Sequence, residues 1–589
     1  MSESRKLRKL QLILWWLIFL VGCIFAVKQT FAQSVFPLPG WFKSNIGRPP
    51  SADRNKIVSD YLASLTKDGK LNLTQLDAVR LVLENNLDVV VDRYDPTLAE
   101  YNIQSAYRAF EPKLKGTLGL QESKSAQPSA FVSGSNYLNT LQHQWNFGYS
   151  QLFQTGTQFQ VDFTNYRYSD NSDRNNVNPY YPTNLQVTLS QPLLKNFGLL
   201  PNNRPIRIAK NNKEINDYLF AQRVIDLVNQ AQVLYWEIVF EKEDIKVKQR
   251  SLDLAKKTNE DNKRQVEIGT LAPIEIVKSE SEIANRKEDL ITAEYTLQQL
   301  EDQFKKLISQ YGDPGQVLAR IEPLDSTLPP TALKDFDLAQ AVAYAIEARP
   351  ELKQLRKQIE NGEIDVKYYH NQMLPDVTVG VIWASSGLDG VIRQYTYDPV
   401  TGLPVTGQIV AQNGWADSLK QIGHADFPTY GAQLTISVPV SNRAARADYA
   451  YASLYKRRLE NLLKSTEQQV ALQVRNSHTN LEMQRARIEA TQKARELAEK
   501  NLEAEQKKFQ LGTSTIRFVL EEQRNLAVAQ SNELRSLVDF TKAKQDLDKS
   551  MGKTLEENNV SITDAIAGDT SSMRKPTASA TFSSLQKLK

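Results

Sequence analysis

The chain has 589 residues and a formal net charge of +4 at pH 7, and its charged residues, 24 % of the total, are interspersed along the sequence without a basic arm. This distribution argues against a nucleic-acid partner. Cys23 is the only cysteine and the four histidines lie far apart, so we expect no internal disulfide, no bound metal and no cofactor. The sequence also lacks phosphate-binding, serine-hydrolase and zinc-protease motifs, which argues against an enzyme.

The N-terminus has the pattern of an export signal. Basic residues within 5–9 precede an apolar run from Leu10 to Val27, and Thr30-Phe31-Ala32 offers small residues where a signal peptidase cleaves, which predicts a signal peptide over residues 1–32. Two alternatives remain open: a lipoprotein-type cleavage that would acylate Cys23, and a retained anchor, since this apolar run is barely long enough to span a bilayer. All three place the rest of the chain outside the cytoplasm.

After an N-terminal extension over residues 33–72, a first set of elements is expected over 73–310. Leu73 to Asp88 has apolar residues at helical spacing and predicts a short amphipathic helix. Over about 113–191 the period changes to two, as in the alternating residues Trp145, Phe147 and Tyr149. Alternating segments of about ten residues with one aromatic face are typical of membrane-spanning barrel strands, in which every backbone group must be paired. A soluble β-sandwich is the alternative.

A long helical hairpin is expected over 205–310. Residues 206–267 contain no proline, and a helix of that length would be roughly 90 Å long. The returning helix has apolar residues at intervals of seven, which is the pattern of coiled-coil packing: Ile283, Leu290, Leu297 and Phe304, with Ala293, Leu300 and Leu307 at the other seam position. Gly269-Thr270 lies between the two helices and is interpreted as the tip where the chain turns back.

The same landmarks recur after a proline-rich linker at 311–335, so we expect a second repeat over 336–551. Phe336 to Glu351 again predicts an amphipathic helix, and alternating residues over about 376–438 predict further strands. A second long hairpin is expected over 442–551, with Gly512-Thr513 at its tip. The polar tail at 552–589 is expected to be mostly disordered. Four to six strands per chain are too few for a barrel of eight strands, so closure would need several chains.

These landmarks together resemble the TolC-type outer membrane efflux protein family. The resemblance is carried over about 73–551 by paired segments: AVRLVLENN and AVAYAIEAR, FEPKL and MLPDV, SQPLL and SVPVS, and the two Gly-Thr tips. It implies a mixed α and β membrane protein, a homotrimer whose outer membrane β-barrel of twelve strands, four from each chain, is continued by a long periplasmic α-helical coiled-coil barrel. One departure is that 113–191 has 79 residues against 63 in 376–438. The extra hairpin is either an extracellular extension or two added strands.

The resemblance also implies a function. The chain would be the outer membrane channel component of a tripartite efflux or type I secretion system, giving passive exit across the periplasm and the outer membrane. Its partners would be outer membrane lipid, a periplasmic adaptor protein and an inner-membrane pump. It would be located in the cell outer membrane, with a large periplasmic part. The alternative is a soluble periplasmic coiled-coil scaffold or adaptor protein, which would share the long helices and lack alternating aromatic strands.

The family likeness points to two groups of site residues near the tips. Adaptor docking is expected at Ile268, Gly269, Thr270, Leu511, Gly512 and Thr513. A gate or selectivity ring is expected at Glu275 and Glu521, since carboxylates follow each tip in the family and threefold symmetry would bring them together. The match is partial, because Ser514 stands where a basic residue can bridge neighbouring helices, and Arg517 is expected to replace that bridge.

Overall fold

The computed structural model describes residues 60–67, 69–128, 136–172, 175–308, 319–325, 336–397, 399–400 and 404–567. All of them belong to the second of two compact units in the chain, Ser59–Lys589. The expected signal peptide with Cys23, most of the linker and residues 568–589 of the tail lie outside the described residues. Among the described helices, none is both long enough and apolar enough to cross a membrane.

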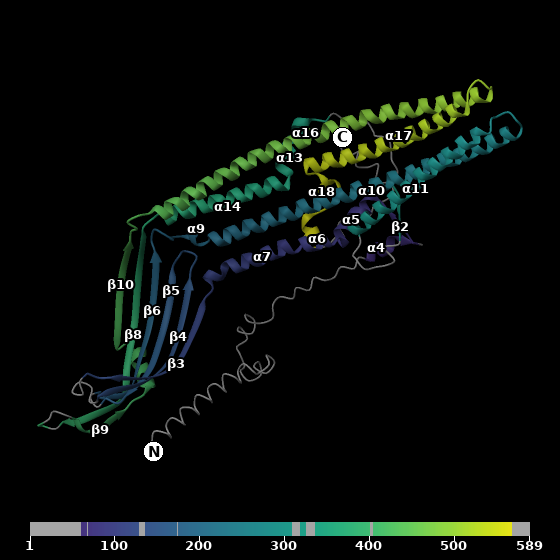
Figure 1. Ribbon diagram of the computed structural model, residues 1–589. Coiled ribbons are helices and arrows are strands. Elements are labelled where there is room, and N and C mark those ends of the chain that lie inside the picture. The colour runs from purple at the N-terminus through teal and green to yellow at the C-terminus, as the bar shows by residue number, and fades with distance from the viewer. Residues whose placement is uncertain are drawn as a thin grey trace, which may run out of the picture. The chain divides into compact units, whose positions relative to one another are not determined.

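The strands of the β part form one antiparallel sheet in the order β10-β8-β6-β5-β4-β3, and β9 pairs with the far end of β8 (Figure 1). Their bounds are β3 Lys113–Ala126, β4 Tyr137–Leu152, β5 Gln158–Asp170, β6 Val177–Pro192, β8 Asp376–Tyr397, β9 Pro404–Gln412 and β10 Phe427–Ser437. A short helix, α15 (Trp415–His424), lies in sequence between β9 and β10 and was not expected.

Six long strands lie side by side in this sheet, which agrees with two added strands, the second of the two alternatives for the extra hairpin, and not with the four strands per chain that the family resemblance implies. The extra hairpin adds two strands: β4 pairs with β3 from Ser150 to Tyr137, and β5 pairs with both β4 and β6. Continuing the sheet gives partners to backbone groups that a projecting hairpin would leave to solvent. β3 and β10 are the two edge strands.

The register sorts the side chains onto two faces, because residues directly opposite each other in a sheet point to the same side. Phe147 is opposite Phe163, Phe163 is opposite Leu185, and Leu189 is opposite Val381. We call this side the apolar face; it carries Leu114, Leu118, Trp145, Phe147, Phe159, Val161, Phe163, Leu185, Val187, Leu189, Val379, Val381, Trp383, Leu434 and Ile436. The other side is the polar face, with Gln144, Asn146, Gln160, Asp162, Gln186 and Thr188.

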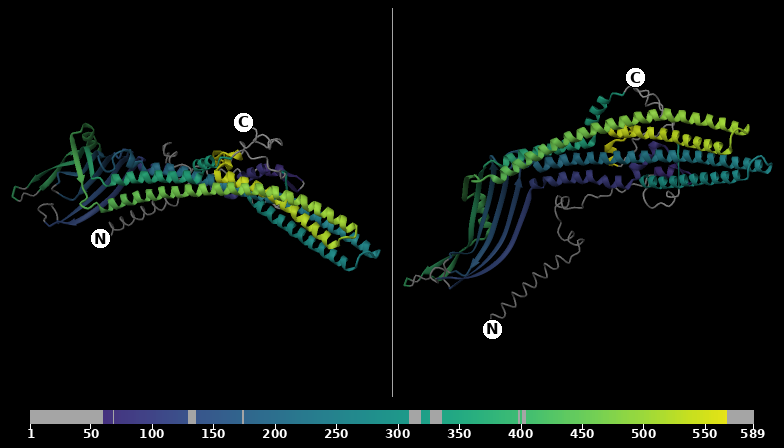
Figure 2. Two further views of the ribbon diagram at one scale, coloured as in Figure 1. Left: turned by 90° about the horizontal axis from the view of Figure 1, so that it is seen from above. Right: turned by 45° about the horizontal axis from the view of Figure 1, so that its top comes forward.

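Two long helical hairpins join the sheet at one of its ends (Figures 1 and 2). The first consists of α10 (Arg204–Glu267) and α11 (Ile274–Ile308), and the second of α16 (Arg443–Gln510) and α17 (Ile516–Met551). At 1.5 Å per residue, α10 and α16 are each roughly 100 Å long. The heptad seam of α11 packs as expected, since Leu290, Ala293, Phe304 and Leu307 are buried.

Shorter helices precede each half of the sheet in the same order. Before β3 lie α5 (Gln75–Asn85), α6 (Leu87–Asp92), α7 (Tyr94–Ala106) and the 3-10 helix η1 (Tyr107–Phe110); before β8 lie α13 (Leu338–Ala348) and α14 (Pro350–Gln372). Thr74 caps α5 by accepting a hydrogen bond from the backbone of Asp77, whose side chain accepts one from Thr74 in return. Asp337 caps α13. A single turn, α9 (Leu199–Asn202), precedes α10.

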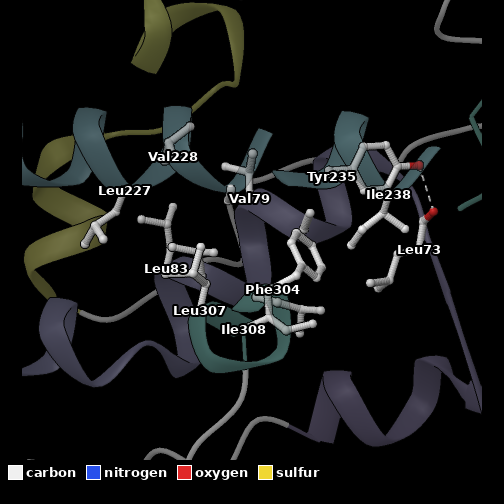
Figure 3. Packing of buried hydrophobic residues seen from close by; sticks show 14 of the residues in the cluster. Leu73, Val79, Leu83, Leu227, Val228, Tyr235, Ile238, Phe304, Leu307 and Ile308 are labelled. Atoms are coloured by element: carbon white, nitrogen blue, oxygen red, sulfur yellow. Dashed lines mark hydrogen bonds between the residues drawn. The ribbon is translucent and has the colours of Figure 1, made fainter. Parts of the chain in front are cut away.

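The largest apolar core lies where α5 and α11 pack against the middle of α10 (Figure 3). Tyr235, Phe304 and Leu83 are fully or almost fully buried there, and the Tyr235 hydroxyl donates to the Leu73 carbonyl at 3.1 Å. A small sheet of β1 (Thr66–Lys67), β2 (Lys70–Leu73) and β7 (Arg320–Pro323) closes one side, next to α4 (Asp60–Leu65).

Parts of both connecting segments belong to this core. Within the expected linker, residues 320–323 form β7, in which Ile321 is fully buried. The tail is expected to be mostly disordered; of its described residues, those in α18 (Thr554–Glu557) and α19 (Ile562–Ala567) pack on the core. Arg93 donates a hydrogen bond to the Ala565 carbonyl at 2.7 Å, which ties the tail to α7. A few apolar residues at the right positions were enough to dock this polar segment.

Candidate functional site at the hairpin tips

The two tips have the same backbone structure. After α10, the Gly269 N–H donates to the Val266 carbonyl at 3.0 Å and the Thr270 N–H donates to the Gln265 carbonyl at 2.9 Å. After α16, the Gly512 and Thr513 N–H groups donate to Phe509 and Lys508 at 3.0 and 2.9 Å. This is the Schellman helix end, which requires a left-handed residue. Gly269 and Gly512 have φ of 80° and 76°.

The threonine of each Gly-Thr pair also has a structural role. The Thr270 hydroxyl donates to the Gln265 carbonyl, and the Thr513 hydroxyl donates to the Lys508 carbonyl, both at 3.0 Å. Each hydroxyl therefore gives a second partner to a carbonyl at the end of a helix, which otherwise lacks an intrahelical donor. Four of the six expected docking residues, the two Gly-Thr pairs, thus explain how the chain turns.

The other two expected docking residues have no such role. Ile268 is 73 % exposed and Leu511 is 79 % exposed, and they occupy the same position, one residue before the glycine. Ile274, Val277 and Phe518 nearby are also largely exposed. Both tips therefore present apolar side chains that nothing in the folded chain covers among the described residues.

Of the expected gate residues, Glu275 lies in the first turn of α11, where the helix N-terminus favours a carboxylate. One of its oxygens lies 2.7 Å from the Lys278 ammonium, and the other is buried and has no hydrogen-bond partner among the described residues. Glu521 is half-buried on α17, five residues after the helix begins at Ile516. No hydrogen bond among the described residues joins Glu275 to Glu521.

The expected bridge by Arg517 is not formed within the described residues. Its guanidinium lies 5.5 Å from the centre of the Phe518 ring, on its own helix. Ser514 instead makes the contact at this level, because its hydroxyl donates to the Glu505 carboxylate of α16. This hydrogen bond, together with one from Lys508, holds the pKa of Glu505 below its usual range. The bridge therefore lies within one hairpin.

The sequence pattern did not lead us to expect a layer of buried polar residues near the tips. Ser279 of α11 donates to the Asn259 side chain of α10 at 2.6 Å, and Asn262 is almost fully buried nearby. The Gln523 amide of α17 donates to the Thr258 hydroxyl of α10 at 3.1 Å and links the two hairpins. The sequence did contain an indication of this buried position, because Ser279 falls fourteen residues before Ala293, on the same heptad seam of α11.

Farther from the tips the two hairpins are joined by charged groups. Arg535 of α17 holds Glu237 of α10 with two hydrogen bonds of 2.7 and 3.2 Å, and Lys542 donates a third. Burial alone would raise the pKa of Glu237, but these donors outweigh it and hold the pKa below its usual range. Asp539 extends the network to Arg487 of α16 at 3.0 Å. The linkage between the hairpins is thus ionic near the core and neutral near the tips.

The comparisons with known proteins concern the whole of this arrangement. A family model described as outer membrane efflux protein matches residues 342–553, and no curated protein matches the chain. The outer-membrane channel OprN is 14 % identical, with a TM-score of 0.57 over 86 % of this chain and 98 % of that one. The CmeC outer membrane channel of Campylobacter jejuni is 13 % identical, with a TM-score of 0.56 over 85 % and 91 %. VceC, an outer membrane protein of Vibrio cholerae, is 14 % identical, with a TM-score of 0.55 over 81 % and 96 %. At these identities the likeness shows the fold alone.

Proposed function

We propose, on the basis of the outer membrane efflux protein model that matches residues 342–553, that the chain is the outer membrane channel component of a tripartite efflux or type I secretion system. The observation that carries the proposal is the sheet with one apolar face. Leu118, Phe147 and Val381 on that face are 81 %, 55 % and 50 % exposed. A contiguous apolar surface of this kind fits lipid, and the polar face opposite it fits a water-filled passage.

The two free edges of the sheet support assembly from several chains. In lipid every backbone group must be paired, so the edge strands β3 and β10 need partners from other copies. In a homotrimer, three chains with six strands each would close an eighteen-stranded barrel, an even number within the known range. The long hairpins would then continue the barrel into the periplasm as a helical tunnel, and the recurring order of elements fits two internal repeats.

The tips are the proposed meeting point with a periplasmic adaptor protein and an inner-membrane pump. Ile268 and Leu511 would contribute apolar contacts, while Gly269, Thr270, Gly512 and Thr513 hold the turns that present them. Because the sequence has no nucleotide-binding motif, passage through the channel is passive and the partner supplies the energy.

The tips are also the proposed gate. Glu275 and Glu521 would converge around the threefold axis, and Arg517 lies one turn before Glu521 on α17. Opening at this level is supported by the linkage between the hairpins, since the hydrogen bond from Gln523 to Thr258 costs far less to break than the ionic network at Glu237.

Fractionation of cells that express the full chain tests the function. The protein is expected in the outer membrane as a heat-resistant trimer, and the purified trimer is expected to conduct ions in planar lipid bilayers. Recovery as a soluble periplasmic monomer would support the scaffold or adaptor alternative and overturn the proposal. The chain without residues 1–32 serves as the control, because it should stay in the cytoplasm.

A further inference from the structure

Helix α15 lies on the apolar face of the sheet. The Trp415 indole packs edge-on against Trp145 with ring centres 6.0 Å apart, and its N–H donates to Asn165 at 3.0 Å. Near the other end of α15, the Ile422 carbonyl accepts a hydrogen bond from the Ser385 hydroxyl at 3.2 Å. Trp145 lies two residues before Phe147, and Ser385 lies two residues after Trp383, so each points to the same face as its apolar neighbour. Both ends of the helix therefore rest on the apolar face.

These contacts set α15 across the strands. Its first residue contacts β4 and β5, and its middle contacts β6 and β8, where the Ser418 hydroxyl donates to the Tyr181 carbonyl. A helix of ten residues is about 15 Å long, which equals about three strand spacings. Gly387 makes the approach possible, because a Cβ there would lie 2.2 Å from the Ser418 carbonyl oxygen.

The chemistry of the apolar face changes where α15 begins to cover it. Toward the helical hairpins the face carries large exposed apolar side chains such as Leu189 and Val381. Under α15 it carries Asn165, Thr183 and Ser385, all fully or nearly fully buried. Lipid could not give these polar groups hydrogen bonds, whereas Trp415 and the Ile422 carbonyl do so for Asn165 and Ser385.

The position of this change matches the thickness of a membrane. From the row under α15 to the end of the sheet near the hairpins, β6 has ten residues, Thr183 to Pro192, and β8 has twelve, Asp376 to Gly387. A tilted strand needs about 9–11 residues to cross the hydrocarbon layer. On the other side of the row, β8 continues to Tyr397 and pairs with β9. The side of α15 away from the sheet is mixed: Lys420 and His424 give it polar groups, Ala416 and Gly423 do not, and the Lys420 ammonium pairs with Asp417 at 2.8 Å.

We propose that α15 lies in the headgroup layer of the outer leaflet, where the polar groups on its exposed side contact phosphate-bearing lipid headgroups, and that it marks the outer limit of the lipid-embedded part of the sheet. This inference rests on the proposed function. Trp145 and Trp415 then lie at the depth where indole rings concentrate at membrane interfaces. β9 and the end of β8 stand in the aqueous phase outside the cell.

Nitroxide labels on single cysteines test the depth of α15. In a Cys23→Ala background, labels are placed at Val381→Cys on the apolar face, at Ala416→Cys and Gly423→Cys on the exposed side of α15, and at Tyr397→Cys on far β8. The trimer is reconstituted in vesicles of phosphatidylethanolamine and phosphatidylglycerol, and collision with oxygen is compared with collision with a water-soluble nickel chelate. The oxygen-to-nickel ratio is expected to be highest at 381, intermediate at 416 and 423, and lowest at 397.

The outcomes separate the inference from the function. A nickel-accessible label at 381 would overturn the outer membrane channel itself. If the label at 381 is embedded in lipid but the oxygen-to-nickel ratios at 416 and 423 equal that at 397 or that at 381, only the role of α15 is overturned. Gly387→Val should push α15 away and shift 416 and 423 toward water while 381 stays unchanged. Trp415→Ala provides a second variant for the same shift if Gly387→Val does not assemble.

Discussion

At Gly512 the backbone is left-handed, with φ of 76°, and, apart from the glycine and its two chain neighbours, no heavy atom of the described residues lies within 4 Å of the place where a Cβ would stand. The cost of a side chain there is therefore conformational and not steric. We expect Gly512→Val to strain the tip by roughly 1–2 kcal/mol, and Gly512→Asn to cost less, because asparagine tolerates this conformation. Valine should lower export while the trimer persists, and asparagine should preserve both.

Drug efflux in a deletion strain and the trimer band on unheated gels provide the two measurements. Loss of export and trimer in equal proportion would mean that the tip serves folding alone.

The positive φ of Gly269 and Gly512 could be predicted from the sequence, because glycine between two helices is the usual helix stop. The contact of Ser514 with Glu505 could not, since the choice among nearby partners depends on side-chain rotamers that spacing does not fix.

At the scale of the elements, the two hairpins are joined by contacts of unequal strength. We expect Gln523→Leu, which removes the hydrogen bond to Thr258, to increase the time that single channels spend open in planar bilayers and to leave thermal stability almost unchanged. Arg535→Met, in contrast, should lower the free energy of unfolding by about 1–3 kcal/mol, because Glu237 loses two of its hydrogen-bond donors.

Asn525→Leu is the matched control, because Asn525 is an exposed residue of the same helix whose contact is to Glu522 on that helix. If Asn525→Leu opened the channel as much as Gln523→Leu, the link between the hairpins would have no special role.

The stability that the network at Glu237 contributes also depends on pH. The pKa of Glu237 is depressed below its ordinary 4.5, so its stabilisation is complete above that pH and is lost as the pH falls through the lower folded-state value.

The long helices and their tips were predictable because their apolar periodicity extends over dozens of residues. Helix α15 was not, since ten residues of amphipathic pattern are too few to distinguish a helix from a loop. Its position depends on the hydrogen bond from Ser385 and on the close approach that Gly387 allows, and both residues belong to the sheet. For a related reason the sequence left open whether each chain has four or six strands, because alternation reveals strands but does not tell whether a hairpin continues a sheet or projects from it.

For the whole molecule, threefold symmetry would turn each tip carboxylate into a ring. We expect Glu521→Gln to lower cation selectivity and to weaken block by multivalent cations, because the ring would lose its converging negative charge. Glu275→Gln should have a smaller effect, since Lys278 already pairs with Glu275 at 2.7 Å. Reversal potentials and block by a trivalent cation in planar bilayers measure both. Unchanged values in both variants would place the constriction elsewhere.

The order of strands in the sheet has a consequence for biogenesis. β3, β4, β5 and β6 pair with their sequence neighbours, so the first half of the chain can form a four-stranded meander from local hairpins before the second half is available. The outer edge of β6 then stays unpaired until β8 is available, and β8 follows both helices of the first hairpin in the sequence. An open edge beside an apolar surface invites aggregation, so this waiting stage is where a chaperone of the periplasm would be needed most.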